Sequence, residues 1–181
     1  MKRIALLVLG IMAASASAFA QSTPEVDKAL IAAPTPQKEG ATVIKWKPDY
    51  TYDTIRKGTN NLVCYDLSGL PGQQPFSIEC TSVNNLGRVA QNLKFEAAGD
   101  KAKTKALLDA AEKDGTRVKP EYGSIWWHAM GDASNPRKHM TIAVPGATSA
   151  SLGGIPDNPK QGGLWLMDSG TSTAHLMVPG N

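Results

Sequence analysis

The stretch VNNLGRVAQNLKFEAAGDKAKTKALLDAAEKDG (residues 83–115) decides the fold class, because it is the most regular part of the chain. Its first half predicts a helix that ends at Gly99, and Asp100 can cap a second helix running to Glu112 before Gly115. The apolar residues of the first helix fall at the spacing of one helical face: Val83, Leu86, Ala90, Leu93 and Ala97. The second is expected to turn four apolar residues inward: Ala106, Leu107, Leu108 and Ala111.

The segments on either side of this helical pair are shorter. Upstream, Thr23 and Pro24 predict the start of a short helix that Pro34 ends, and residues 41–46 and 62–65 have the composition of strands. Downstream, Gly, Pro and Asn clusters separate four short apolar or alternating runs, at residues 124–130, 140–144, 164–167 and 174–178. The sequence therefore predicts an α+β domain, with an antiparallel or mixed sheet and two or three helices packed on one face.

The first twenty residues are typical of a secretory signal peptide. Lys2 and Arg3 precede an apolar run, and Ala18-Phe19-Ala20 is a cleavage site before Gln21. This predicts one secreted or periplasmic domain over residues 21–181, with no membrane span once residues 1–20 are removed. The chain of 181 residues has 41% hydrophobic and 19% charged residues and a net charge of +3. It has no polybasic stretch, which argues against a nucleic-acid partner.

The only two cysteines, Cys64 and Cys80, lie in a segment rich in turn-forming residues. In an oxidising compartment such a pair predicts a disulfide, worth about 3 kcal/mol for a loop of this length. A two-thiolate metal site and a catalytic thiol are the alternatives. Both need reduced sulfur, and no CxxC or neighbouring Cys/His spacing favours either.

Several segments resemble a group of uncharacterised secreted bacterial proteins. They are residues 41–46, residues 55–60 leading to Cys64, then Cys80, His139-Met140-Thr141-Ile142 and Gly170-Thr171. The most specific element is the ending Ala174-His175-Leu176-Met177-Val178-Pro179. The resemblance covers most of the chain after the leader. It implies export and a single fold, and it carries no activity, ligand or partner.

Two partial catalytic motifs overlap near the C-terminus. Residues 166–172 match the apolar-Asp-Ser-Gly-Thr pattern of aspartic proteases around Asp168, but no second copy supplies the partner aspartate. Ser172 lies in Gly170-Thr171-Ser172-Thr173-Ala174, one residue short of a Gly-x-Ser-x-Gly nucleophile elbow. The elbow needs a helix directly behind it, whereas the residues that follow here predict a strand. Both motifs are therefore interpreted as a strand followed by a polar turn.

Aromatic and histidine side chains are the remaining candidates. Trp126 and Trp127 precede His128 in a predicted strand and so face opposite sides of the sheet, with one in the core. The other either stacks on a sugar or aromatic ligand or packs under a helix or loop, and we favour packing. His139 and His175 each lie on the less apolar side of their strands. If the strands share a sheet and two or three of the histidines converge, they would make a zinc or copper site or an acid/base pair. The alternative, which we favour, is that each ring is half-buried and hydrogen-bonded to backbone or to a loop carboxylate.

These observations favour a binding or interaction module whose partner is a small ligand or an envelope component. A hydrolase using His139 or His175 with Ser172 or an aspartate is the first alternative, and an envelope structural or stress protein is the second. No metal and no cofactor is predicted, and the sequence implies no particular oligomeric state. A deep pocket holding a histidine beside Ser172 or Asp168 would favour the enzyme, and an open groove lined by a tryptophan would favour binding.

Overall fold

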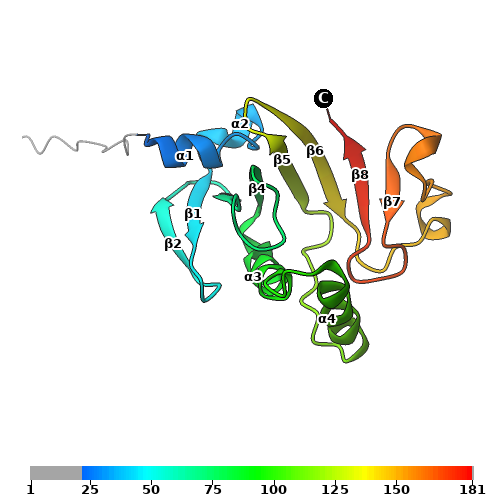
Figure 1. Cartoon of the computed structure of the whole chain (residues 1–181). Coiled ribbons are helices and arrows are strands. Elements are labelled where there is room, and N and C mark those ends of the chain that lie inside the picture. The colour runs from blue at the N-terminus through cyan, green and yellow to red at the C-terminus, as the bar shows by residue number, and fades with distance from the viewer. Residues whose placement is uncertain (1–21, 181) are drawn as a thin grey trace, which may run out of the picture.

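The computed structural model describes residues 22–180, so the predicted signal peptide lies outside the described residues. Four helices and eight strands follow one another along this part of the chain (Figure 1). The helices are α1 (Pro24–Ala29), α2 (Thr35–Lys38), α3 (Leu86–Glu96) and α4 (Lys101–Lys113). The strands are β1 (Thr42–Trp46), β2 (Tyr52–Arg56), β3 (Leu62–Asp66), β4 (Ser77–Ser82), β5 (Ile125–Asp132), β6 (Asn135–Ala143), β7 (Trp165–Met167) and β8 (His175–Pro179).

All eight strands join one sheet in the order β2-β1-β3-β4-β5-β6-β8-β7. The pair β1–β3 is parallel and every other neighbouring pair is antiparallel. The parallel pair arises because β2 folds back along one side of β1, and the chain then returns to place β3 along the other side. The predicted α+β class with a mixed sheet is therefore confirmed.

The sequence pattern located six of the strands and missed β2 and β4. Strand β2 is an edge strand whose first three residues are exposed, so it has no apolar alternation to detect. Strand β4 lies inside the turn-rich segment around Cys80, where the turn signals hide it. The β3–β4 hairpin places Cys64 directly opposite Cys80, and the two form the predicted disulfide, leaving no free thiol among residues 22–180.

The predicted capping residues act as expected. The Thr23 hydroxyl accepts from the Val26 amide at the start of α1, and the Asp100 carboxylate accepts from the Lys103 amide at the start of α4. Gly99 has a φ of 67°, the left-handed conformation that glycine adopts after a helix.

Four details of the helices differ from the prediction. The first helix ends at Ala29, before the predicted stop at Pro34, and the short helix α2 was not predicted. Val83 lies in a 3-10 turn before α3 and is 43% exposed, because the capping Ser82 begins a tighter turn there. In α4 only Ala111 is buried, and Ala106 and Leu107 face solvent. The reason is that α4 packs beside α3 rather than onto the sheet, so it needs a narrower apolar stripe.

The helices divide between the two faces of the sheet. Helices α3 and α4 lie on one face, which we call the α3 face, and α1 contacts β3 and β4 on the opposite face, the α1 face (Figure 1). Each side has its own apolar core, and strand alternation sends neighbouring residues to different cores. Val43 and Cys64 pack under α1, whereas Ile44 and Tyr65 pack under α3.

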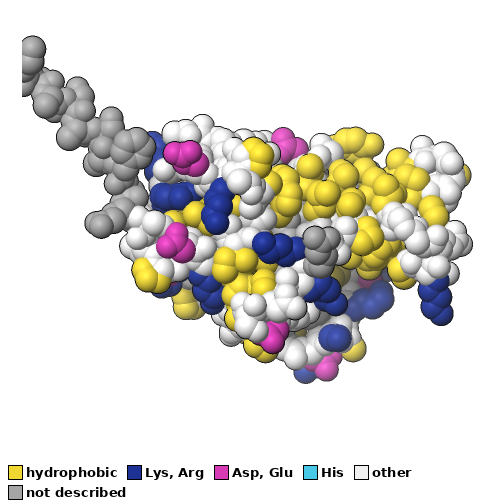
Figure 2. Space-filling view, turned by 90° about the horizontal axis from the view of Figure 1, so that it is seen from above, with side chains coloured by type: hydrophobic (Ala, Val, Ile, Leu, Met, Phe, Trp, Pro, Cys, Tyr) yellow, Lys and Arg dark blue, Asp and Glu magenta, His cyan; other side chains and the backbone are white. Residues whose placement is uncertain are grey.

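Beyond α1, the α1 face carries large apolar side chains that stay partly exposed. Figure 2 shows hydrophobic side chains gathered on the surface away from α1. Strands β5, β6 and β8 contribute partly buried residues to this face: Ile125, Trp127, Met140, Ile142, Leu176 and Val178. No helix within residues 22–180 is long and apolar enough to cross a membrane.

Candidate functional site

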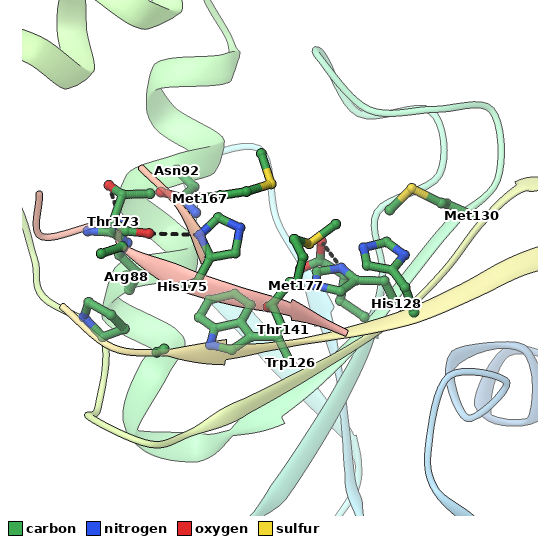
Figure 3. Close-up of a pocket in the computed structure, with 15 residues that line it drawn as sticks. Arg88, Asn92, Trp126, His128, Met130, Thr141, Met167, Thr173, His175 and Met177 are labelled. Carbon is green, nitrogen blue, oxygen red and sulfur yellow. Dashed lines mark hydrogen bonds and ion pairs between the residues drawn. The ribbon is translucent and has the colours of Figure 1, made fainter. Parts of the chain in front are cut away.

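A cleft of about 320 Å³ lies on the α3 face, where α3 does not reach across the whole sheet. Its floor is formed by β5, β6 and β8, one wall by α3, and its far rim by β7 and the turn that precedes β8 (Figure 3). Strand alternation explains the lining, because every second residue of the three floor strands faces α3. The residues form three consecutive rows that run across the strands.

The first row is a chain of polar side chains on four adjacent strands. Tyr65, Glu79, His128 and His139 occupy directly paired positions on β3, β4, β5 and β6. Tyr65 donates its hydroxyl to Glu79 Oε2 at 3.3 Å, and His128 Nδ1 lies 3.1 Å from Glu79 Oε1. The His139 ring stacks on the His128 ring with centroids 4.5 Å apart and 9° between the ring planes. The sheet therefore presents a connected polar line that ends in two imidazoles.

Proton positions in this row follow from the partners. Because Glu79 is an acceptor, His128 holds its proton on Nδ1, which leaves Nε2 as the nitrogen available to the cleft. Burial, followed by the positive charge that His128 gains on protonation, lowers the pKa of His139 to about 4. Burial also raises the pKa of Tyr65 well above its usual value, and the Glu79 carboxylate adds to this effect. At neutral pH His139 is therefore uncharged and Tyr65 is a hydrogen-bond donor.

The second row forms the middle of the floor. Trp126 pairs with Thr141 across β5 and β6, and Thr141 pairs with Met177 across β6 and β8. An indole ring and a thioether give a flat, polarisable surface, and Thr141 supplies one hydroxyl. Trp127 lies on the opposite face, half-buried against the core under α1. The prediction that the two tryptophans separate is thus confirmed, and Trp126 is the one that lines the cleft.

The third row and α3 form the cationic end of the cleft, which we define by Arg88, Asn92, Thr173 and His175 (Figure 3). Arg88 and Asn92 are one turn apart on α3 and share one side of that helix. Arg88 donates to the Val118 carbonyl and, at 2.8 Å, to Thr173 Oγ1. His175 Nδ1 lies 2.8 Å from the Thr173 carbonyl, so Nδ1 carries the proton there as well.

Arg88 and Arg117 are both buried, at 4% and 7% exposure, and neither has a carboxylate within 4 Å in the described part of the chain. Their partners are neutral: Arg117 donates to Gln91 Oε1 and Asn92 Oδ1, and its Nε has no partner. Burial, with the nearby Arg117, lowers the pKa of Arg88 to about 10, so it stays charged at neutral pH. Buried charges are usually paired, so this arrangement is unusual.

The structure separates the three histidines into two groups on the same face. His128 and His139 are paired on neighbouring strands. His175 pairs with Ala143, which lies four residues after His139 on β6, so these two positions of β6 are about 13 Å apart at the rise of a strand. Among residues 22–180, no three side chains of the types His, Cys, Asp and Glu gather where a metal ion could be held.

Ser172 and Asp168, from the two partial motifs, lie at the rim without forming a triad. Ser172 is buried, and it gives its amide and its hydroxyl to the two oxygens of Glu112 at 2.7 and 2.5 Å. Those two hydrogen bonds lower the pKa of Glu112. Asp168 follows β7 with a φ of 51°, and its half-exposed carboxylate lies 3.9 Å from His175 Nδ1. Ser172 is therefore engaged by a carboxylate and not by a histidine.

Sequence reasoning missed four residues that shape the cleft: Tyr65, Glu79, Arg88 and Asn92. A signal was present for two of them, because Glu79 alternates with Ile78 and Cys80, and Arg88 lies between the apolar residues Leu86 and Val89. A charged residue within a buried stretch indicates a polar partner or a site. The partners themselves come from strands and loops distant in sequence, so the pattern does not name them.

The chain was compared with protein families, with curated proteins and with solved structures. None of the three comparisons gives a match. The features of the candidate site therefore come from the structure of this chain alone.

Proposed function

We propose that this domain is a binding module that holds a small, ring-bearing ligand in the cleft on its α3 face. The observation that carries the proposal is the floor of the cleft, where Trp126, Thr141 and Met177 form a flat, largely apolar surface between two polar ends. Sites for small molecules combine an apolar lining with a few oriented polar groups, which is the composition found here.

The dimensions support a ligand of modest size. Small-molecule sites usually measure roughly 300–1,000 Å³, so a cleft of about 320 Å³ suits a molecule of one or two fused rings. A protein or peptide partner would need a broader surface than this cleft offers. Stacking on Trp126 would give affinity, and hydrogen bonds at the two ends would set the orientation.

The test is a screen of one-ring and two-ring aromatic fragments, followed by amide and indole shifts in two-dimensional NMR of the protein. We expect hits that move the signals of Trp126, Thr141 and Met177, and that bind at least several-fold more weakly to Trp126→Leu. Trp127→Leu is the matched control, because it removes the same side chain from the opposite face. Hits confined to the Trp127 face, or no hits, would reject the proposal.

We also propose that the protein acts after export, in a periplasm or outside the cell. The leader pattern of residues 1–20 and the Cys64–Cys80 disulfide support this location, since disulfides persist in oxidising compartments. Fractionation of the native host would test it. Accumulation of the full-length chain in the cytoplasm would contradict it.

A second candidate function is hydrolysis, which one observation favours. Glu79 fixes the tautomer of His128 and leaves Nε2 toward the cleft, the arrangement by which a carboxylate orients a histidine base. With Ser172 engaged by Glu112, the nucleophile would be water rather than serine. If 4-nitrophenyl esters are hydrolysed, the activity should disappear in His128→Phe and fall in Glu79→Gln. Turnover unchanged in both variants would eliminate this candidate.

A further inference from the structure

We infer that the ligand of this cleft carries a carboxylate, which binds at the cationic end beside Arg88 and Asn92, while its ring lies on Trp126. This inference rests on the proposed function and adds the charge and orientation of the ligand. It comes from the placement of the charged and polar groups at that end.

The first observation is the state of Arg88. A guanidinium has five N–H donors, and Arg88 forms two hydrogen bonds, both to neutral oxygens, although it is only 4% exposed. Removing a charge from water is costly unless an opposite charge or a full set of hydrogen bonds replaces the water. Arg88 lines the cleft, so an anionic ligand can reach the donors that the protein leaves unused.

The second observation is the orientation of Asn92. Its Oδ1 accepts a hydrogen bond from Arg117, so its amide nitrogen, with two donors, is turned away from Arg117. Asn92 also lines the cleft, one helical turn from Arg88. Thr173, whose oxygen already accepts from Arg88, has its own hydroxyl proton free to donate. Three donor groups therefore meet at one end, which suits the two oxygens of a carboxylate.

The nearby carboxylates leave this position open. Glu112 and Asp168 favour the charged form of Arg88 from beyond 4 Å, but neither accepts a hydrogen bond from it. Glu112 directs both oxygens to Ser172, and Asp168 is half exposed near His175. Glu79, the acidic residue that lines the cleft, belongs to the opposite end, where it is bonded to Tyr65 and His128. The cleft thus has a donor end and an imidazole end, with the aromatic floor between them (Figure 3).

The experiment uses pairs of probes that differ only in charge: indole-3-acetate with indole-3-acetamide, and 2-naphthoate with 2-naphthamide. Affinities at neutral pH and the shifted residues are measured by two-dimensional NMR on the oxidised protein. We expect both carboxylates to shift Trp126 and to bind about tenfold or more tightly than their amides, because a charge-assisted hydrogen bond is stronger than a neutral one.

The decisive variant is Asn92→Asp, which replaces the amide donor with a negative charge. The new carboxylate still accepts from Arg117, so the local fold is retained. We expect the preference for carboxylate over amide to fall below about threefold, since the ligand now faces a like charge. Asn158→Asp is the control for net charge, because Asn158 caps a short turn that aspartate caps equally well. This control should keep the preference.

The outcomes distinguish a failure of the carboxylate inference from a failure of the proposed binding function. Equal binding of acids and amides in the cleft would overturn the carboxylate inference and leave the binding function standing. A preference that survives in Asn92→Asp would also overturn it, by showing that the anion lies elsewhere. If no probe shifts Trp126 and its neighbours at millimolar concentration, both the inference and the proposed function are wrong.

Discussion

Two partly buried titratable groups, His139 and Glu96, should change the free energy of unfolding in opposite directions as the pH falls. Replacing either one should therefore reveal the effect of the other. Burial lowers the pKa of His139 from 6.5 to about 4, and burial raises the pKa of Glu96 from 4.5 to about 7 despite a hydrogen bond from Gln73. His139 lies in the cleft, stacked on His128. Glu96 lies in the last turn of α3.

The signs follow from which state binds more protons. Between pH 6.5 and 4 the unfolded chain protonates His139 and the native state does not, because the native pKa is depressed, so stability falls as the pH falls. Between pH 7 and 4.5 the native state protonates Glu96 and the unfolded chain does not, so stability rises as the pH falls. Each shift corresponds to at most about 3.4 kcal/mol; since both side chains are partly exposed, we expect roughly 2 kcal/mol from each.

The variants are His139→Phe, which keeps a ring to stack on His128, and Glu96→Gln, which keeps an acceptor for Gln73. The assay is urea unfolding without reductant, followed by tryptophan fluorescence at several pH values from 7 to 4. Relative to wild type, His139→Phe should gain about 2 kcal/mol on acidification and Glu96→Gln should lose about 2 kcal/mol. Differences from wild type that stay constant with pH, within about 0.5 kcal/mol, would refute the reasoning.

Three further predictions concern processing, the core and the rim. The mature protein should begin at Gln21 and contain no alkylatable thiol before reduction, since Cys64 and Cys80 are bonded; an intact mass showing two alkylated cysteines would contradict this. Asn85→Ala should lower the free energy of unfolding by roughly 3 kcal/mol, because the fully buried amide makes three hydrogen bonds to neighbouring segments. Chemical denaturation measures this loss, and a value under about 1 kcal/mol would show that water replaces the three hydrogen bonds. Asp168→Asn should change stability by less than about 0.5 kcal/mol and leave probe binding intact, because asparagine tolerates the positive φ and the carboxylate is half exposed; acid-optimal proteolysis abolished by this variant would prove the opposite.

Local signals in the sequence were sufficient for α1, α3 and α4 and for most strands, but not for the short α2. The helix ends depend on contacts over a few positions, as at Thr23, Gly99 and Asp100. The neighbouring sequence is therefore enough to predict them. Strand alternation likewise fixed the side of the sheet for Trp126 and Trp127, because successive side chains of any strand point to opposite faces. Strand β2 lacked this signal because most of it faces solvent on both sides.

The composition of the site needed the tertiary structure. Alternation gives the face on which Glu79, His128 or His139 lies, but only strand order makes them neighbours, and strand order depends on pairing between residues up to 53 positions apart. The same holds for Arg88, whose partner Thr173 lies in the turn before β8, 85 positions away along the chain. The motif leaves the Ser172 hydroxyl available as a nucleophile, whereas in the structure that hydroxyl donates a hydrogen bond to Glu112.

The sequence by itself determined the elements, their faces and the oxidised cysteine pair, because these depend on local geometry and composition. The tertiary structure decided which side chains meet in the cleft, because that depends on long-range pairing that no local pattern encodes.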